Sequence, residues 1–95
     1  MDIVLDMTPI TDEDLLARVK ELNDYGENNY DDNKIKLGIA EAKTFLLAGG
    51  IPKGIVNSVA CVGVIAYYVD DYNRRNGISD FVVMKVAQLR GLIYE

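Results

Sequence analysis

The chain has 95 residues, of which 15 are Asp or Glu and 10 are Lys or Arg, and it contains no His, no Trp and a single Cys. A length below the roughly 100–150 residues of a typical domain predicts one domain. The absence of His excludes an imidazole base, a Ser-His or Cys-His nucleophile pair and the usual zinc sites. We therefore expect a protein that is not an enzyme and that holds no metal or cofactor.

The charges are unevenly spread along the chain. Residues 1–48 carry 11 acids and 5 bases, whereas residues 49–95 carry 4 acids and 5 bases. An acidic half disfavours adhesion to nucleic-acid phosphates, which requires clustered Lys and Arg. Because a single Cys cannot form an internal disulfide and the acidic opening Met1–Asp6 does not resemble a signal peptide, we expect an intracellular protein.

Residues 1–10 alternate weakly between apolar and polar side chains, and Pro9 favours an extended Thr8. This stretch is expected to form an extended arm or a short edge strand. Thr11 then precedes three acids in a pattern typical of a helix N-terminus. Apolar residues follow at helical spacing, which predicts a first helix over 12–23.

A polar, turn-forming stretch over 23–32 predicts a surface loop. Beyond it, Asp31 and Asp32 suit the start of a second helix over 31–48, and Gly49-Gly50 supplies its stop. Ser79 can cap a last helix over 80–93, in which Asp80 lies in the first turn.

Between Gly50 and Ser79 the chain is dominated by one apolar run over 55–69. Its length falls short of the roughly 20 residues that span a bilayer, so the run predicts a long buried third helix over 53–75, with no membrane contact. Its many β-branched residues leave a strand open as an alternative. Together these elements predict an all-α, four-helix domain over 1–95.

The carboxylate clusters are candidates for acid-base chemistry or cation binding, but most lie where helices begin. Asp12-Glu13-Asp14 and Asp31-Asp32 suit helix N-termini electrostatically, so capping is the favoured interpretation. The stretch 24–32 lacks the Gly and Glu placement of a calcium-binding loop. Cys61, in the middle of the apolar run, is expected to fill the core.

A more distinctive group follows the apolar run at the end of the predicted third helix. Asp70-Asp71 and the following Arg residues either pair across a contact with a neighbouring subunit or form a solvated last turn in which Asp71 pairs with Arg75. Tyrosines at this end bring apolar area and a hydroxyl, as interface anchors do. The candidate subunit or partner interface comprises Tyr67, Tyr68, Asp70, Asp71, Tyr72, Arg74 and Arg75.

The assembled pattern over 11–94 resembles the phage head-to-tail connector proteins, also called head-completion or neck proteins. The similar features are the segment "EAKTFLLAGGI" over 41–51 and the segment "VIAYYVDDYNRRNG" over 64–77. In that family the second helix carries an Ala-rich segment before a Gly turn, which Ala40, Ala42, Phe45, Leu46 and Gly49 match. The third helix ends in an aromatic and Arg-containing stretch, which Tyr72 and Arg75 match. Asp70-Asp71 departs from the family, because many relatives carry His or Trp before the Tyr.

The resemblance implies a structural virion component at the head-tail junction, assembled in the host cytoplasm. Subunits of this family form a ring, often of about twelve copies, that docks on the portal protein, extends the DNA channel and receives a tail or neck protein. DNA would only pass through the channel without specific contacts. The alternative is a small acidic binding module, such as a DNA-mimicking inhibitor or adaptor.

Overall fold

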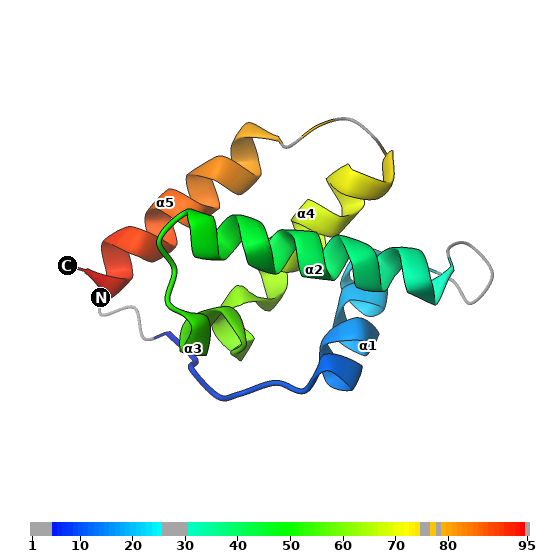
Figure 1. The fold of residues 1–95 in the computed structure, drawn as a ribbon, viewed down its shortest axis with the longest axis horizontal. Coiled ribbons are helices and arrows are strands. Elements are labelled where there is room, and N and C mark those ends of the chain that lie inside the picture. The colour runs from blue at the N-terminus through cyan, green and yellow to red at the C-terminus, as the bar shows by residue number, and fades with distance from the viewer. Residues whose placement is uncertain (1–4, 26–30, 75–76, 78, 95) are drawn as a thin grey trace.

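The computed structural model describes residues 5–25, 31–74, 77 and 79–94. Within them the chain is all-α (Figure 1), with one isolated antiparallel bridge between Pro9 and Ser58. The elements in chain order are α1 (Asp12–Leu22), α2 (Asp32–Ala48), α3 (Lys53–Val56), the 3-10 turn η1 (Val59–Cys61), α4 (Val62–Arg74) and α5 (Asp80–Ile93). The apolar run over 55–69 is mostly helical, as predicted, and does not form the alternative strand.

Three helices begin at the capping residues that the sequence indicates. Thr11 Oγ1 accepts a hydrogen bond from the Asp14 N–H at 3.1 Å, and Asp31 Oδ1 accepts one from the Asn33 N–H at 2.9 Å. Ser79 Oγ accepts one from the Val82 N–H at 3.4 Å. Each bond satisfies a backbone donor that the first helical turn would otherwise leave without a partner.

The end of α2 is fixed by a Schellman motif centred on Gly50. The Gly50 N–H donates to Leu47 O at 3.0 Å, and the Ile51 N–H donates to Leu46 O at 3.1 Å. Gly50 has a φ of 93°, which glycine adopts without the steric penalty of a Cβ atom. The chain therefore turns sharply after α2 and buries Ile51 in the core.

The same motif ends α1, but here Asp24 occupies the left-handed position with a φ of 55°. The Asp24 N–H donates to Glu21 O at 3.2 Å, and the Tyr25 N–H donates to Lys20 O at 2.8 Å. This turn directs Tyr25 inward, where its side chain is buried. A residue of the predicted surface loop thus belongs to the core.

Replacing Asp24 with glycine is expected to stabilise the fold by about 0.5–1 kcal/mol, because glycine removes the steric cost of a left-handed backbone. In a domain of this size, that gain raises the melting temperature by about 2–8 °C, which thermal unfolding followed by circular dichroism measures. Asp24→Ala is the control, since it removes the same charge but keeps Cβ. Equal stabilisation by both substitutions would show that charge, not backbone conformation, is responsible.

The predicted third helix over 53–75 is wrong as a single element, because the chain breaks at Asn57 and Ser58. Asn57 Nδ2 donates to Lys53 O at 3.1 Å, and the buried Ser58 Oγ donates to Ile55 O at 2.6 Å. Short polar side chains that bond to nearby backbone carbonyls in this way compete with helix formation. The backbone of Ser58 is extended, at φ −118° and ψ 169°, so α3 ends after one turn.

Residues 6–10 run alongside this break and complete its hydrogen bonds. The Val59 N–H donates to Thr8 O at 2.9 Å, and the Ala60 N–H donates to Asp6 O at 2.8 Å. The Ile10 N–H donates in turn to Asn57 O at 3.0 Å. The backbone groups released by the break are therefore paired with the N-terminal segment rather than with water.

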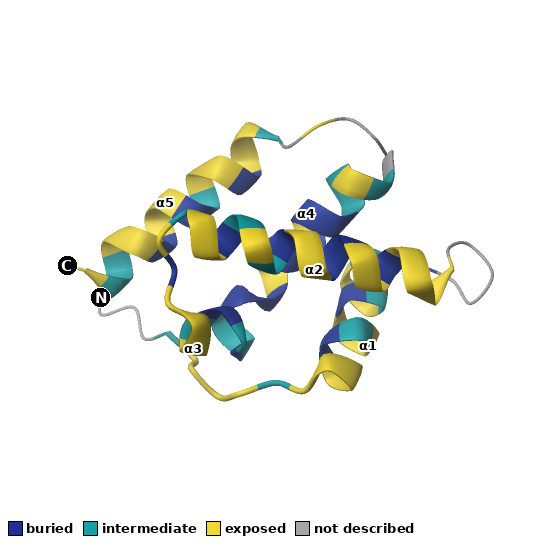
Figure 2. Ribbon diagram, in the orientation of Figure 1, coloured by how far each residue is buried: buried dark blue, intermediate teal, exposed yellow. Residues whose placement is uncertain are grey.

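α4 lies at the centre of the molecule and packs against α1, α2 and α5 (Figures 1 and 2). The side chains that face these neighbours are almost completely buried and form one cluster. Its largest fully buried members are Leu15, Val19, Ile35, Leu46, Ile51, Val56, Ile65, Val69 and Val82. None of the helices in the described residues has the length and apolarity needed to cross a lipid bilayer.

Candidate assembly interface

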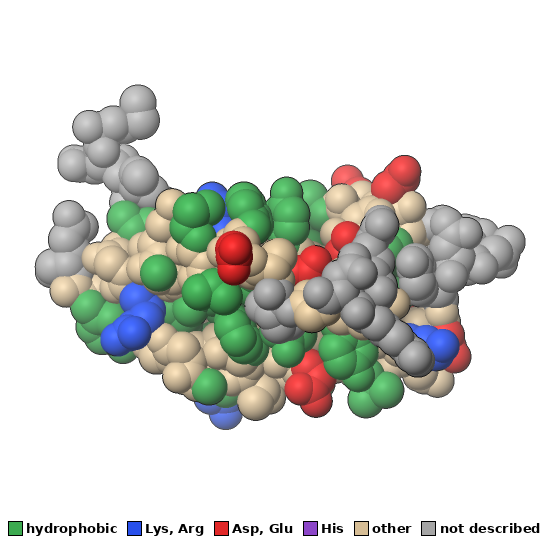
Figure 3. Space-filling model, turned by 90° about the horizontal axis from the view of Figure 1, so that it is seen from above, with side chains coloured by type: hydrophobic (Ala, Val, Ile, Leu, Met, Phe, Trp, Pro, Cys, Tyr) green, Lys and Arg blue, Asp and Glu red, His purple; other side chains and the backbone are tan. Residues whose placement is uncertain are grey.

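Helix α5 is apolar on more sides than the subunit covers. Val82, Val86 and Leu89 are buried against the rest of the molecule. Phe81, Val83 and Met84 nevertheless remain 37%, 53% and 48% exposed. Figure 3, which looks onto the molecule from the α5 side, shows hydrophobic side chains gathered across the middle of that face. Large apolar side chains grouped on an exposed surface often mark a contact site, so the segment of α5 over 81–84 is a candidate contact surface.

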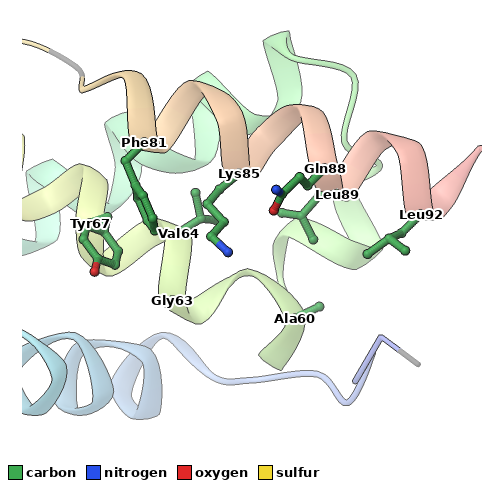
Figure 4. Close-up of a pocket in the computed structure, with 9 residues that line it drawn as sticks. All are labelled: Ala60, Gly63, Val64, Tyr67, Phe81, Lys85, Gln88, Leu89 and Leu92. Carbon is green, nitrogen blue, oxygen red and sulfur yellow. The ribbon is translucent and has the colours of Figure 1, made fainter. Parts of the chain in front are cut away.

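A groove of about 500 Å³ runs between α4 and α5 (Figure 4). From α4 and the turn before it, the lining residues are Ala60, Gly63, Val64 and Tyr67. From α5, the lining residues are Phe81, Lys85, Gln88, Leu89 and Leu92. The lining is mostly apolar, and its single charged side chain is Lys85. We call this feature the α4–α5 groove.

The predicted interface tyrosines lie on different sides of α4. Tyr67 is 52% exposed at the α4–α5 groove, where its ring lies 4.4 Å from that of Phe81. Tyr68 is buried on the other side of the helix, with its ring 5.4 Å from that of Phe45. Tyr72 is 43% exposed on the α2 side. Only Tyr67 therefore contributes to the groove.

The predicted interface carboxylates make hydrogen bonds within the subunit. Asp70 Oδ1 accepts from the Tyr25 hydroxyl at 3.1 Å, and Asp71 Oδ2 accepts from the Ser79 N–H at 3.1 Å. These bonds tie the end of α1 and the start of α5 to the end of α4. Arg74 is the last residue of α4. Arg75 lies outside the described residues, and so the predicted pairing of Asp71 with Arg75 also lies outside them.

No family model, curated protein or solved structure matches this chain. The resemblance to head-to-tail connectors accordingly rests on the two segments quoted for it, 41–51 and 64–77. What the described residues add independently is the exposed apolar surface of α5 and the adjoining groove.

Burial shifts the pKa values of two side chains of α4 and the turn before it, Cys61 and Tyr68. Burial raises the pKa of the Cys61 thiol to about 11, which disfavours the reactive thiolate and agrees with a core position. Burial, with help from the nearby Glu41 and Tyr72, also raises the pKa of Tyr68. Within the described residues, no three His, Cys, Asp or Glu side chains come close enough together to hold a metal ion.

The prediction from sequence missed the groove residues of α5 and one buried aromatic residue of the core. Phe81 and Lys85 line the groove but were assigned only to the last helix, although the run of consecutive apolar residues over 81–84 is visible in the sequence. Tyr25 was assigned to a surface loop, and an aromatic ring in an otherwise polar stretch was the available signal.

Proposed function

We propose that this protein is a non-enzymatic structural subunit that works by self-assembly, as a ring-forming head-to-tail connector of a phage or prophage. The observation that carries the proposal is the apolar surface of α5, which one subunit leaves open beside the α4–α5 groove. In a chain this small, burying that surface against another copy adds apolar contact that a single core lacks. The resemblance over 11–94 supplies the context of portal, channel and tail.

The distribution of acids also supports a structural role over the acidic binding module. Asp31 caps α2 through its side chain, and Asp12 and Asp32 form ion pairs with Lys43 and Lys20 at 3.1 Å and 2.9 Å. A DNA mimic needs its acids free and spread over one exposed face. Here several of them serve helix starts or link α1 to α2 instead.

Analytical ultracentrifugation and native mass spectrometry over rising concentration test the proposal. We expect the chain to form a closed oligomer and to bind a portal protein. A chain that stays monomeric at every concentration and does not bind portal protein would contradict it. Salt-sensitive binding to a nuclease or a repressor by such a monomer would favour the acidic module.

A further inference from the structure

Gly63 of α4 lines the α4–α5 groove. The fold of the subunit does not require a glycine at this position. A Cβ atom added at Gly63 would meet no other atom within 4 Å, and its backbone does not require a positive φ. Glycine in a helix is less favourable than alanine by roughly 0.5–1 kcal/mol. Among the described residues no atom occupies the space of an added Cβ here, so glycine leaves room for the close approach of another backbone along the groove.

The charge in the groove indicates what should fill it. The Nζ atom of Lys85 lies 5.4 Å from the centre of the Phe81 ring. Among the described residues, no carboxylate forms an ion pair with Lys85. A partner surface that complements the groove would therefore present apolar side chains with one carboxylate among them.

The outer side of α2 has this composition. Its inner side covers α4 with Ile35, Ile39 and Leu46, but Leu37 and Leu47 are 60% and 46% exposed. The exposed residues between these two leucines include the small Ala40 and Thr44 and a single acid, Glu41.

Glu41 is available for a contact outside the subunit. The ion pairs of the described residues are Lys20 with Asp32 and Lys43 with Asp12, so none of them involves Glu41. We call the exposed side of α2 that comprises Leu37, Ala40, Glu41, Thr44 and Leu47 the outer α2 stripe. It offers two leucines and one carboxylate to a groove that has one lysine.

The outer α2 stripe and the α4–α5 groove lie on opposite sides of the subunit. Gly38 of α2 lies against Val69 and Tyr72 of α4. At 100° per residue, Tyr67 projects about 160° away from Val69, so the groove opens on the side of α4 that α2 does not cover. Figure 1 accordingly shows α2 in front of α4, whereas Figure 4 shows the groove between α4 and α5.

We propose that the outer α2 stripe of a second copy occupies the α4–α5 groove, with its leucines over Gly63 and Glu41 beside Lys85. This inference rests on the proposed self-assembly. The outer α2 stripe and the α4–α5 groove are different surfaces on opposite sides of the subunit. Two copies joined in this way therefore still have one free stripe and one free groove, so further copies can add head to tail. Such a contact closes into a ring when the rotation between copies allows it.

Two variants that each disable one surface test this contact. Gly63→Leu fills the groove but leaves the outer α2 stripe intact, and Leu37→Gln with Leu47→Gln removes the leucines but leaves the groove intact. Each variant alone is expected to associate at least about tenfold more weakly than the wild-type chain. An equal mixture of the two is expected to form a one-to-one pair and no larger oligomer, as measured by native mass spectrometry.

Gly91→Leu is the matched control, because Gly91 is also helical, exposed and open around an added Cβ atom but does not line the groove. It should assemble like the wild-type chain, and circular dichroism checks that every variant is folded. A Gly63→Leu chain that assembles as well as wild type, or a mixture that forms no pair, would overturn this contact and leave self-assembly standing. A monomeric wild-type chain would overturn the proposed function itself.

Discussion

Replacing Ile65 with alanine is expected to lower the free energy of unfolding by about 2–5 kcal/mol. Ile65 is completely buried in α4, the helix that packs against α1, α2 and α5. Truncation there removes apolar contacts and leaves a cavity that helices on three sides cannot easily close. A domain of this size has a total stability of roughly 5–15 kcal/mol, so the variant loses a large fraction of it.

Urea unfolding followed by circular dichroism measures this effect, at a protein concentration low enough to keep the chain monomeric. Leu37→Ala is the control, because it removes an aliphatic side chain of the same size that is 60% exposed. The free energy of unfolding of the Leu37→Ala chain should fall by less than about 1 kcal/mol. Equal losses for the two variants would contradict the placement of α4 at the centre of the core.

Raising the pH from 9 to 11 is expected to destabilise the wild-type chain through Cys61. Burial raises the pKa of this thiol from an ordinary value of 9.0 to about 11, so the folded state holds the proton more tightly than the unfolded state. The resulting stabilisation is present below pH 9 and is lost as the pH rises toward 11. At 1.36 kcal/mol per pKa unit the complete loss is about 3 kcal/mol, reached only above pH 11, and about 2 kcal/mol of it falls between pH 9 and pH 11.

Chemical unfolding of the wild-type chain and of Cys61→Ala at a series of pH values measures this loss. The Cys61→Ala chain starts less stable because it loses a buried sulfur, so the comparison concerns the change with pH rather than the absolute values. Tyr68, whose pKa is also raised, contributes to a decrease in stability above pH 10 in both chains. The same pH dependence in both chains would refute the assignment to Cys61.

The parts of the fold that depend on local chemistry could be predicted from the sequence. Thr11, Asp31 and Ser79 cap their helices because a short side-chain oxygen reaches an N–H two or three residues ahead. The break at Ser58 was not predicted, although the short polar side chains of Asn57 and Ser58 that form it are local. The backbone groups that the break leaves free are paired with residues 6–10, and no periodicity within the apolar run reveals that pairing.

The candidate interface was predicted only in part, for a related reason. Tyr67 and Tyr68 are adjacent in sequence but point about 100° apart on a helix. Which of the two is exposed depends on where α2 and α5 pack, so a prediction from sequence included both. The groove itself requires the relative position of α4 and α5, which the periodicity of neither helix gives.

The pairing of residues 6–10 with the break between α3 and α4 has a consequence for the order of folding. Its hydrogen bonds join positions about 50 residues apart, and closing a loop of that length costs entropy before any bond forms. The helical turns need only local contacts and can form first. Residues 6–10 are therefore expected to reach their final place late, by docking onto helices that have already formed.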